Sequence, residues 1–338
     1  MMRRDAAVVA GLLMDRLLGE PPAGWHPVAR YGQAMQALEA RIYRDRRGRG
    51  VAYAAAGVAA AWLAGRVLQP RRARTRWGRP MEPAAVGLAT YIAVAGKALA
   101  AAATDVARPL ASGDLATSRQ RLPALVGRDP SRLEAAEISR AAVESVAENT
   151  VDAIVAPALW AAVAGAPGVL AYRAVNTLDA MVGHPSPRYR RFGWASARAD
   201  DVAGWVPARI TALLVALVRP AAAPRVWRAV RTQAPAHPSP NAGVAEASFA
   251  AALGLRLGGT NSYGPRTEHR PHLGAGRPAD IADIDRAGSL SRDVTVALGL
   301  LLLGPRLVAA ARNAGRAHGP CWARRGRKAP PMEATRFR

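Results

Sequence analysis

Three carboxylates stand four residues apart in the segment "ESVAENTVD", which places Glu144, Glu148 and Asp152 around Asn149. A four-residue step in an α-helix turns by only about 40°, so Glu144 and Glu148 share a face with Arg140, and Asp152 lies at its edge. Carboxylates so placed bind magnesium or act as general bases. The alternative is a solvated helix side held by an Arg140–Glu144 ion pair, and spacing alone does not choose between the two.

The carboxylates end where an uncharged run begins, "AIVAPALWAAVAGAPGVLAY" at residues 153–172, and a second polar group follows it. There Arg173, Asn176 and Asp179 are three apart, on one helical side. Carboxylates beside a low-dielectric region require cationic or metal partners, because burying a bare charge is too costly. If the chain doubles back at "GAPG", both groups face one cavity, whereas a continuous span separates them. Pro157 and the "GAPG" break favour doubling back.

A third polar group, "RFGWASARADDVAGWVPARIT", contains Arg198, Asp200 and Asp201 beside Trp194 and Trp205. Adjacent aspartates are typical of a helix N-cap and first turn, and magnesium ligation is the competing interpretation. The two indoles are either a stacking surface for a large ligand or ordinary packing groups, and packing is the simpler interpretation.

The segment "HPSPNAGVAEASFAAALGLRLGGTNSYGP" predicts a loop, a short helix and a glycine-rich turn. Asn241 is a candidate cap for the helix that contains Glu246. The turn is able to present backbone N–H groups to an anion, although a turn without a ligand is the simpler interpretation. His26 and His237 each precede a proline, which fixes an extended or turned backbone. The sequence contains neither a P-loop motif nor a zinc-type histidine spacing.

Composition limits the classes of protein to consider. The 338-residue chain has a formal net charge of +23, and of its 47 basic residues only Lys97 and Lys328 are lysine. This arginine excess is most simply a compositional bias of the genome, and the functional alternative is an anionic partner. Cys321 is the only cysteine, which excludes an intrachain disulfide and a cysteine-rich zinc site. The N-terminal segment lacks a small-residue cleavage site, which favours an uncleaved membrane-seeking helix over a signal peptide.

Helices must position these polar groups, because alanine and leucine runs favour helix and proline and glycine divide the chain into helix-sized pieces. Uncharged stretches recur at residues 50–65, 83–96, 153–172 and 294–305. Only 153–172 reaches the length of about 20 residues that a bilayer span needs. Composition alone leaves a membrane protein and a soluble helical bundle equally open, and arginines on both sides of 50–65 leave the orientation unsettled.

Together these segments resemble a known family, the adenosylcobinamide-phosphate synthases, which are CobD/CbiB-type membrane proteins of cobalamin biosynthesis. The resemblance runs in the family's order from about residue 8 to residue 292, and its most specific parts are "VAENTVDAIVAP" and "YRAVNTLDAMVG". Gly19-Glu20-Pro21 stands where the family usually has Gly-Asp-Pro, Val244-Ala245 where it often has Trp-Pro, and "GHPSPRY" replaces a more polar link. Each departure affects a turn or a contact, and none removes a motif carboxylate.

The resemblance implies an all-α fold, a multi-pass membrane helical bundle with re-entrant or broken helices and polar connecting segments. It places a single integral-membrane domain at residues 1–312, in the cell (inner) membrane. Residues 50–65, 83–103, 153–172 and 294–312 are then expected to be embedded or re-entrant. Residues 313–338 are basic and contain proline, so they are expected to form a disordered tail.

The function that the resemblance implies is that of an ATP-dependent carbon–nitrogen ligase, an acid–amine ligase. It would join adenosylcobyric acid to (R)-1-aminopropan-2-ol or its O-phosphate, giving adenosylcobinamide or its phosphate. A carboxylate is a poor electrophile, so phosphorylation must supply a leaving group and a base must take a proton from the amine. ATP and Mg²⁺ are the expected cofactors. The expected site comprises catalytic Glu144, Glu148, Asp152 and Asp179; substrate-binding His26, Asn149, Arg173, Asn176, Arg198, His237 and Asn241; and metal-binding Glu148, Asp152, Asp200 and Asp201.

Three other functions compete with this one. An intramembrane prenyl- or phospho-transferase would use Asp-bound magnesium, and a non-catalytic corrinoid-binding membrane protein would bind the corrinoid without turnover. A basic nucleic-acid-binding protein would need a solvent-facing arginine surface, and the carboxylate clusters and apolar stretches argue against nucleic acid. The expected partners are corrinoid and amino-alcohol small molecules and membrane lipid. Homo-oligomers and assemblies with other cobalamin-pathway proteins are left open.

Overall fold

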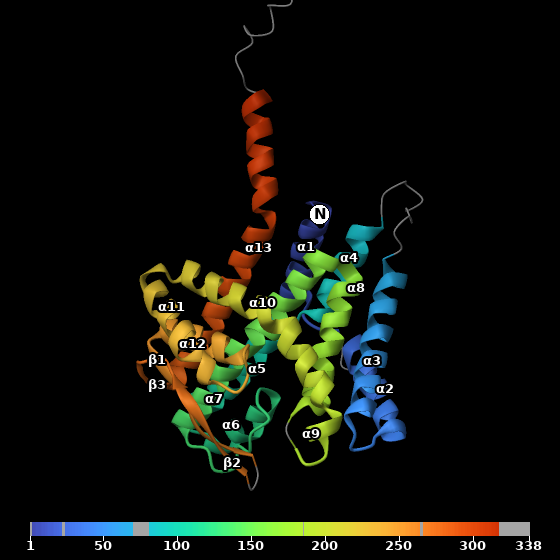
Figure 1. Ribbon diagram of the computed structural model, residues 1–338. Coiled ribbons are helices and arrows are strands. Elements are labelled where there is room, and N and C mark those ends of the chain that lie inside the picture. The colour runs from blue at the N-terminus through green and yellow to red at the C-terminus, as the bar shows by residue number, and fades with distance from the viewer. Residues whose placement is uncertain (1, 22–23, 70–80, 185, 264–265, 318–338) are drawn as a thin grey trace, which may run out of the picture.

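Helices dominate the computed structural model, which describes residues 2–21, 24–69, 81–184, 186–263 and 266–317 (Figure 1). The α-helices are α1 (Met2–Leu18), α2 (Pro27–Ile42), α3 (Arg47–Leu68), α4 (Glu82–Ala93), α5 (Gly96–Ala111), α6 (Leu115–Arg121), α7 (Ala135–Thr150), α8 (Ala156–Leu178), α9 (Tyr189–Phe192), α10 (Trp194–Val218), α11 (Ala223–Thr232), α12 (Ala242–Leu253) and α13 (Ile281–Ala317). Short helical turns are η1 (Leu122–Ala124), η2 (Val151–Val155), η3 (Asp179–Gly183), η4 (Pro220–Ala222) and η5 (Ala234–Ala236), and the strands are β1 (Leu255–Tyr263), β2 (Arg266–Leu273) and β3 (Arg277–Pro278).

Among the described residues, five helical segments are long and apolar enough to cross a bilayer: Arg47–Leu68, Glu82–Ala111, Ala135–Gly183, Trp194–Val218 and Ile281–Gly304. This confirms the predicted all-α, multi-pass membrane bundle. Four of the segments contain or overlap the predicted apolar stretches. The fifth, α10, was not predicted as a span, because the charges near its start obscure the apolar run in its second half.

The predicted span at residues 83–103 is a broken helix. α4 ends at Ala93 and α5 begins at Gly96. At the break, the backbone N–H of Ala95 donates to the carbonyl of Ala153 in η2, at 3.0 Å. A break inside an apolar segment is tolerated when another part of the protein satisfies the freed backbone groups. The break therefore ties α4 and α5 to the turn that carries Asp152.

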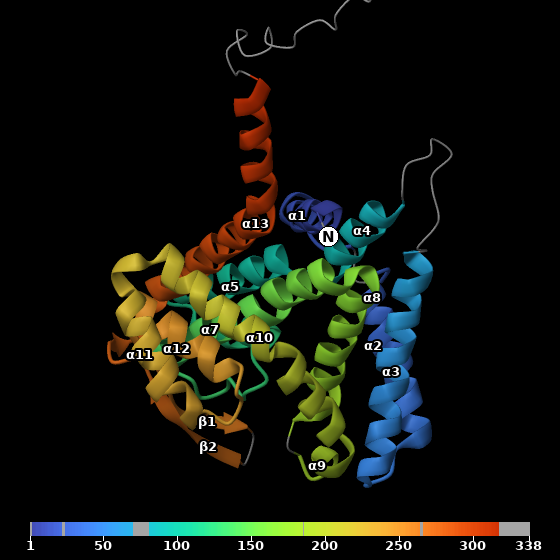
Figure 2. The ribbon, with the colours of Figure 1, turned by 45° about the horizontal axis from the view of Figure 1, so that its top comes forward.

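The apolar run at residues 153–172 does not form one straight span. α8 has a non-helical residue inside it, Gly165, with φ 68° and ψ −156°. The second half of α8 then runs beside α3, where small residues allow close approach (Figure 2). The kink returns Arg173 and Asp179 to electrostatic range of Asp152. The prediction that the chain doubles back at "GAPG" is confirmed.

We expect Gly165→Ala to destabilise the protein by at least about 2 kcal/mol, because this φ/ψ combination is open essentially only to glycine. An added Cβ would also meet the amide of Gln69, whose Oε1 accepts the Ala166 N–H at 2.7 Å. Thermal unfolding in detergent measures the effect. Gly299→Ala in α13 is the matched control, since its Cβ would meet no atom within 4 Å. Equal melting temperatures for the two variants would contradict the prediction.

The predicted glycine-rich turn "LGGTNSYG" is wrong, because Leu255–Tyr263 forms strand β1. β1 pairs antiparallel with β2 and parallel with β3, in the order β2-β1-β3. The register shifts between Leu257 and Gly259, and Gly258 and Gly259 there have φ of 81° and 100°. Such glycines are typical of a β-bulge, where they bend a strand without ending it. The sequence showed the glycines but not the pairing partner.

The end of the predicted membrane domain lies inside a helix. α13 continues to Ala317, so residues 313–317 are helical rather than part of a disordered tail. Residues 318–338 of the predicted tail and the arginine-rich segment 70–80 lie outside the described residues.

Candidate active site

Acidic side chains from three separate segments meet at the centre of the bundle. Asp152 lies in electrostatic range of Asp179, Asp200 and Arg173. Arg173 Nη1 donates to Asn176 Oδ1 at 3.3 Å, and Asn176 Nδ2 donates a long bond to Asp200 Oδ1 at 3.5 Å. We call these five residues the Asp152 cluster. All five residues keep partial solvent exposure.

Two of the carboxylates in the Asp152 cluster sit in π-turns. Asp152 is the second residue of η2, which joins α7 to α8, and Asp179 is the first residue of η3, at the end of α8. A π-turn shifts the side chains away from the positions that a regular α-helix gives them, and such turns occur frequently at functional sites. The two turns therefore aim Asp152 and Asp179 toward α10, which supplies Asp200.

Glu148 lies between the Asp152 cluster and a network on its other side, which we call the Glu144 network. Its members are Arg128, Arg140, Glu144, His237, Glu246 and Arg270. Glu148 is an exposed residue, and its carboxylate lies in electrostatic range of Asp152, Asp179 and Asp200. On its other side it interacts with Arg270 and Arg128. The catalytic and metal-binding roles of Glu148 stay predictions.

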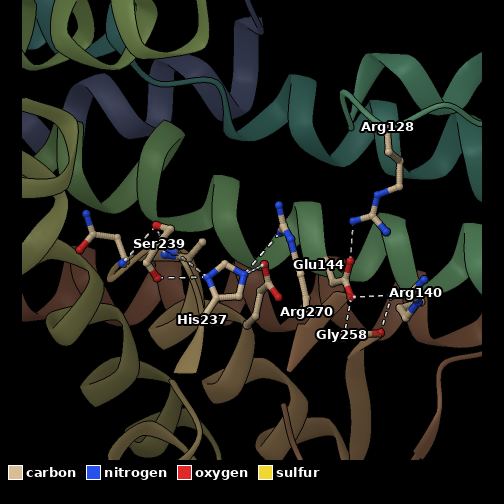
Figure 3. A network of polar contacts seen from close by, with 10 residues as sticks. Arg128, Arg140, Glu144, His237, Ser239, Gly258 and Arg270 are labelled. Atoms are coloured by element: carbon tan, nitrogen blue, oxygen red, sulfur yellow. Dashed lines mark hydrogen bonds and ion pairs between the residues drawn. The ribbon is translucent and has the colours of Figure 1, made fainter. Parts of the chain in front are cut away.

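Glu144 is buried in an ion-pair network, and it holds the sheet against α7 (Figure 3). Its carboxylate lies 2.5 Å from Arg128 Nη2 and 3.6 Å from Arg140 Nη1, which confirms the Arg140–Glu144 ion pair. It also accepts the backbone N–H of Gly258 at 2.8 Å. Arg140 in turn donates to the carbonyl of Gly258, and to that of Thr260 at 2.9 Å. The anion that the glycine-rich segment binds is thus an internal carboxylate, and the catalytic role of Glu144 stays a prediction.

A buried histidine, His237, and a buried glutamate, Glu246, complete the Glu144 network. His237 Nδ1 accepts the Ser239 N–H at 3.1 Å, and its Nε2 lies 3.4 Å from Arg270 Nη1 (Figure 3). The same Nε2 lies 3.7 Å from Glu246 Oε1. Burial lowers the pKa of His237, and burial raises the pKa of Glu246 well above its ordinary value, aided by Glu144 and Glu148. Both side chains are therefore favoured in their neutral forms.

The raised pKa of Glu246 predicts a pH-dependent stability. Folding takes up a proton wherever the pH lies between the ordinary glutamate pKa and the raised one, so stability falls with rising pH in that window by about 1.4 kcal/mol per pH unit. Arg270, Arg128 and His237 also face this carboxylate and limit the effect. We expect Glu246→Gln, which mimics the protonated form, to remove that fall. Melting temperatures at pH 5 and pH 8 test this, and a gap between variant and parent that does not widen at pH 8 would refute it.

Sequence reasoning missed two members of the Glu144 network, Arg128 and Arg270. It also did not predict that Glu246 is buried. Arg128 lies in "LVGRDPSR", which the sequence marks only as a break between helices. Arg270 lies on β2, a strand that the sequence does not predict. The available signal was the presence of these arginines near the carboxylate motifs, because a buried carboxylate needs a cationic partner.

Several predicted site residues lie away from the Asp152 cluster or have other partners. His26 is buried at the N-cap of α2, where its Nδ1 accepts the Val28 N–H at 3.2 Å. Asn149 Nδ2 donates to the Ser145 carbonyl at 3.0 Å. Arg198 pairs with Asp201 at 3.0 Å on the outer side of α10. Their substrate and metal roles stay predictions.

Asn241 and the two aspartates of α10 do not act as helix caps. Asn241 occupies the N-cap position of α12, but its side chain accepts from Arg209 Nη1 at 3.2 Å and donates to the Asp201 carbonyl at 2.9 Å. Asp200 and Asp201 lie inside α10, whose N-cap is Gly193. Asn241 therefore fastens α12 to α10 behind the Asp152 cluster.

Trp194 and Trp205 are half-exposed rather than core residues. Trp194 is 41% exposed, with Arg47 over its ring at 5.1 Å, and Trp205 is 52% exposed, with Arg209 over its ring at 4.3 Å. Exposed indoles capped by arginine are typical of a membrane interface. This placement agrees with interfacial packing.

The chemistry of the Asp152 cluster suits a divalent cation bound together with a phosphate. No group of three His, Cys, Asp or Glu side chains within the described ranges is arranged to hold a metal ion. Magnesium, however, commonly uses one or two carboxylates and completes its shell with water and substrate phosphates. Asp152 and Asp200 supply such oxygens, and Arg173 Nε is a buried donor that bonds to no other described residue. The metal assignments stay predictions.

Comparison with known proteins gives a consistent family. Residues 8–291 match the family described as CobD/Cbib protein. The "Cobalamin biosynthesis protein CobD" of Mycobacterium tuberculosis H37Rv is 47% identical over 301 residues, covering 88% of this chain and 94% of that protein. Proteins of the same name from Chromobacterium violaceum and Halalkalibacterium halodurans are 42% and 40% identical, covering 82% and 83% of this chain and 88% and 90% of their own lengths. No solved structure matches the chain.

Proposed function

The chain belongs to the CobD/Cbib family of cobalamin biosynthesis proteins, and from that premise we propose that it is the ATP-dependent ligase that attaches the amino-alcohol to the corrinoid. In this proposal a carboxylate of adenosylcobyric acid is joined to (R)-1-aminopropan-2-ol or its O-phosphate. The observation that carries the proposal is the Asp152 cluster, in which Asp152 lies in electrostatic range of Asp179, Asp200 and Arg173, and Arg173 Nε bonds to no other described residue.

The reaction requires two chemical steps. The corrinoid carboxylate first takes the γ-phosphoryl group of ATP, giving an acyl phosphate and ADP. The amine nitrogen then attacks the carbonyl carbon, the C–O bond to phosphate breaks, and the nitrogen loses a proton to a base. Both steps place negative phosphate beside the reacting carbon, so the site must supply cations and N–H donors.

The residues of the Asp152 cluster divide between these needs. Arg173 donates from Nε to a phosphate oxygen, and its bond to Asn176 fixes the guanidinium plane. Asp152 and Asp200 would hold a magnesium ion, which would neutralise charge on the transferred phosphoryl group. Asp179, on the opposite π-turn, holds the ammonium of the incoming amine. Glu148, exposed and in range of the cluster, takes the proton that the nitrogen releases.

The Glu144 network positions Glu148 for this chemistry. Glu144, Arg128 and Arg140 lock α7 against the bulge of β1, one turn away from Glu148. Glu148 is thereby held on a rigid helix face, which matters because a catalytic base must lie within hydrogen-bond reach of its proton.

Location and partners follow the same proposal. The chain is a multi-pass membrane protein, and we place it in the cell (inner) membrane, where the soluble reactants ATP and amino-alcohol meet it from the cytoplasm. The corrinoid is the large partner, and the exposed tryptophans of α10 lie next to the aspartates that would handle its carboxylate.

The test is product analysis with membranes that contain the protein. Adenosylcobyric acid, ATP and Mg²⁺ are supplied with aminopropanol or its O-phosphate, and the corrinoid products are identified by mass. We expect a mass gain equal to the amine minus water, together with one ADP per amide. Turnover of an isoprenyl diphosphate in place of the corrinoid would instead favour a prenyltransferase. Corrinoid binding without any ATP-dependent product would leave a non-catalytic binding protein.

A further inference from the structure

A cavity lies apart from the Asp152 cluster, between α1, α5 and α13, with a volume of about 300 Å³. Its walls are mostly apolar and include Leu12, Leu99, Val146 and Ile154. Ile154 and Asp152 are two residues apart in η2, and residues at that spacing point to roughly opposite sides of a helical turn. The cavity is therefore on the other side of η2 from the proposed active site.

One carboxylate, that of Asp15, lines this cavity and is only 4% exposed. Its Oδ2 accepts the backbone N–H of Lys97 at 3.1 Å, whereas its Oδ1 is buried and accepts no hydrogen bond from the described part of the chain. Burial raises the pKa of Asp15. A buried acceptor without a donor is costly, so a ligand N–H group at Oδ1 would be strongly favoured, and a cationic one most of all.

The same cavity is also lined by three cations, Arg16, Lys97 and Arg292. Lys97 Nζ donates to the carbonyl of Leu17 at 3.0 Å, and Arg292 Nη2 donates to Ser289 Oγ at 2.7 Å. Neither contact involves a carboxylate. Within the described residues, no carboxylate oxygen lies within 4.0 Å of a cationic nitrogen of these three side chains. A ligand that is complementary to the whole cavity therefore carries a cation for Asp15 and an anion for the surrounding basic groups.

The charged groups of the cavity mark a boundary between polar and apolar surface. Each stands at the end of an apolar run: residues 6–14 before Asp15 and Arg16, residues 84–96 before Lys97, and residues 294–304 after Arg292. Beside the cavity, apolar side chains of α1 and α13 are exposed, with Leu13 at 55%, Leu17 at 73%, Val296 at 62% and Leu300 at 57%. In a membrane protein such a surface faces lipid tails. Lys97 follows the break between α4 and α5, and Arg292 precedes the apolar part of α13, so we place these charges at headgroup level.

We propose that this cavity binds the headgroup of a phospholipid with a primary amine, such as phosphatidylethanolamine, with its ammonium on Asp15 Oδ1 and its phosphate among Lys97, Arg16 and Arg292. The acyl chains then lie along the exposed apolar side chains of α1 and α13. A choline headgroup has no N–H to give to Oδ1, and a glycerol headgroup has no cation. The proposal is independent of the ligase function, because it uses none of the residues of the Asp152 cluster.

The test is lipid competition in nanodiscs that contain the full chain. Native mass spectrometry counts the lipids retained after detergent release from discs with equal phosphatidylethanolamine, phosphatidylcholine and phosphatidylglycerol. We expect phosphatidylethanolamine to be retained over phosphatidylcholine by about tenfold, the scale of one charge-assisted hydrogen bond. Asp15→Asn should bring that ratio close to one, and Lys97→Gln should lower retention of both lipids.

The control is Asp5→Asn, the same change on the same helix at a residue that does not line the cavity. It should keep the parent's preference. A parent with no preference for the primary amine overturns the proposal, as does an Asp15→Asn variant that keeps the preference and the parent's melting temperature. Displacement of the lipid by free O-phosphoethanolamine at millimolar concentration also overturns it, because the cavity would then be a site for soluble aminoalkyl phosphates. If Asp15→Asn does not fold, the parent's preference and the Lys97→Gln result decide the outcome.

Discussion

Replacing Asp152 by Asn is expected to lower ATP-dependent amide formation by at least about a hundredfold, the scale on which a positioned catalytic group contributes to a rate. The change is nearly isosteric, so it removes the charge without removing the side chain. In the proposed mechanism that charge would hold magnesium against the phosphate. Asp179 in η3 and Asp200 in α10 cannot supply the same oxygen from their own positions. Glu148→Gln is expected to show a loss of similar size, because it removes the proton acceptor.

The two variants should differ in what restores them. An excess of Mg²⁺ should raise the rate of Asp152→Asn in part, since weaker metal binding is offset by concentration, and it should leave Glu148→Gln unchanged. Initial rates of amide formation at several Mg²⁺ concentrations, with melting temperatures to confirm folding, measure this. Asp105→Asn, the same chemical change at an exposed residue of α5, is the control. Parent-like turnover in both Asp152→Asn and Glu148→Gln would remove these carboxylates from the mechanism.

The Asp152 cluster could be predicted in part because much of it depends on helical spacing between residues that are close in the sequence. Four-residue spacing put Glu144 and Glu148 on one face, and three-residue spacing put Arg173, Asn176 and Asp179 on another. A single break, Gly165, was enough to bring the two faces together, and glycine and proline announce such breaks in any sequence. What the spacing could not show is that Asp152 and Asp179 fall in π-turns, because an extra residue in a turn leaves no mark in the order of residue types.

The partners of Glu144 could not be predicted for a different physical reason. Arg128, 16 residues earlier, and Gly258, 114 residues later, reach Glu144 only through tertiary packing. Helix periodicity carries no information about contacts of that length. The strand that supplies Gly258 was also hidden, since glycines in a bulge resemble glycines in a turn. The face of α7 was thus predicted correctly, whereas the different surroundings of its two glutamates, with Glu144 buried in the ion-pair network and Glu148 exposed, required the fold.

Because Glu144 is buried in the ion-pair network, removing its charge is expected to cause a large loss of stability. Glu144→Gln should destabilise the protein by about 3–5 kcal/mol, because it leaves the buried guanidinium of Arg128 without the carboxylate that it contacts at 2.5 Å. The amide oxygen still accepts the Gly258 N–H, so the loss reports the charge rather than the shape. Arg128→Met combined with Glu144→Gln should recover part of it, since the double variant no longer sets a buried guanidinium against an uncharged amide at that position. The matched control is Glu134→Gln, which breaks the Arg119–Glu134 pair, where the Glu134 side chain is 75% exposed, and should cost under about 1 kcal/mol. Thermal and denaturant unfolding in detergent compares the four proteins, and equal costs for Glu144→Gln and Glu134→Gln would show that the network does not hold β1 against α7.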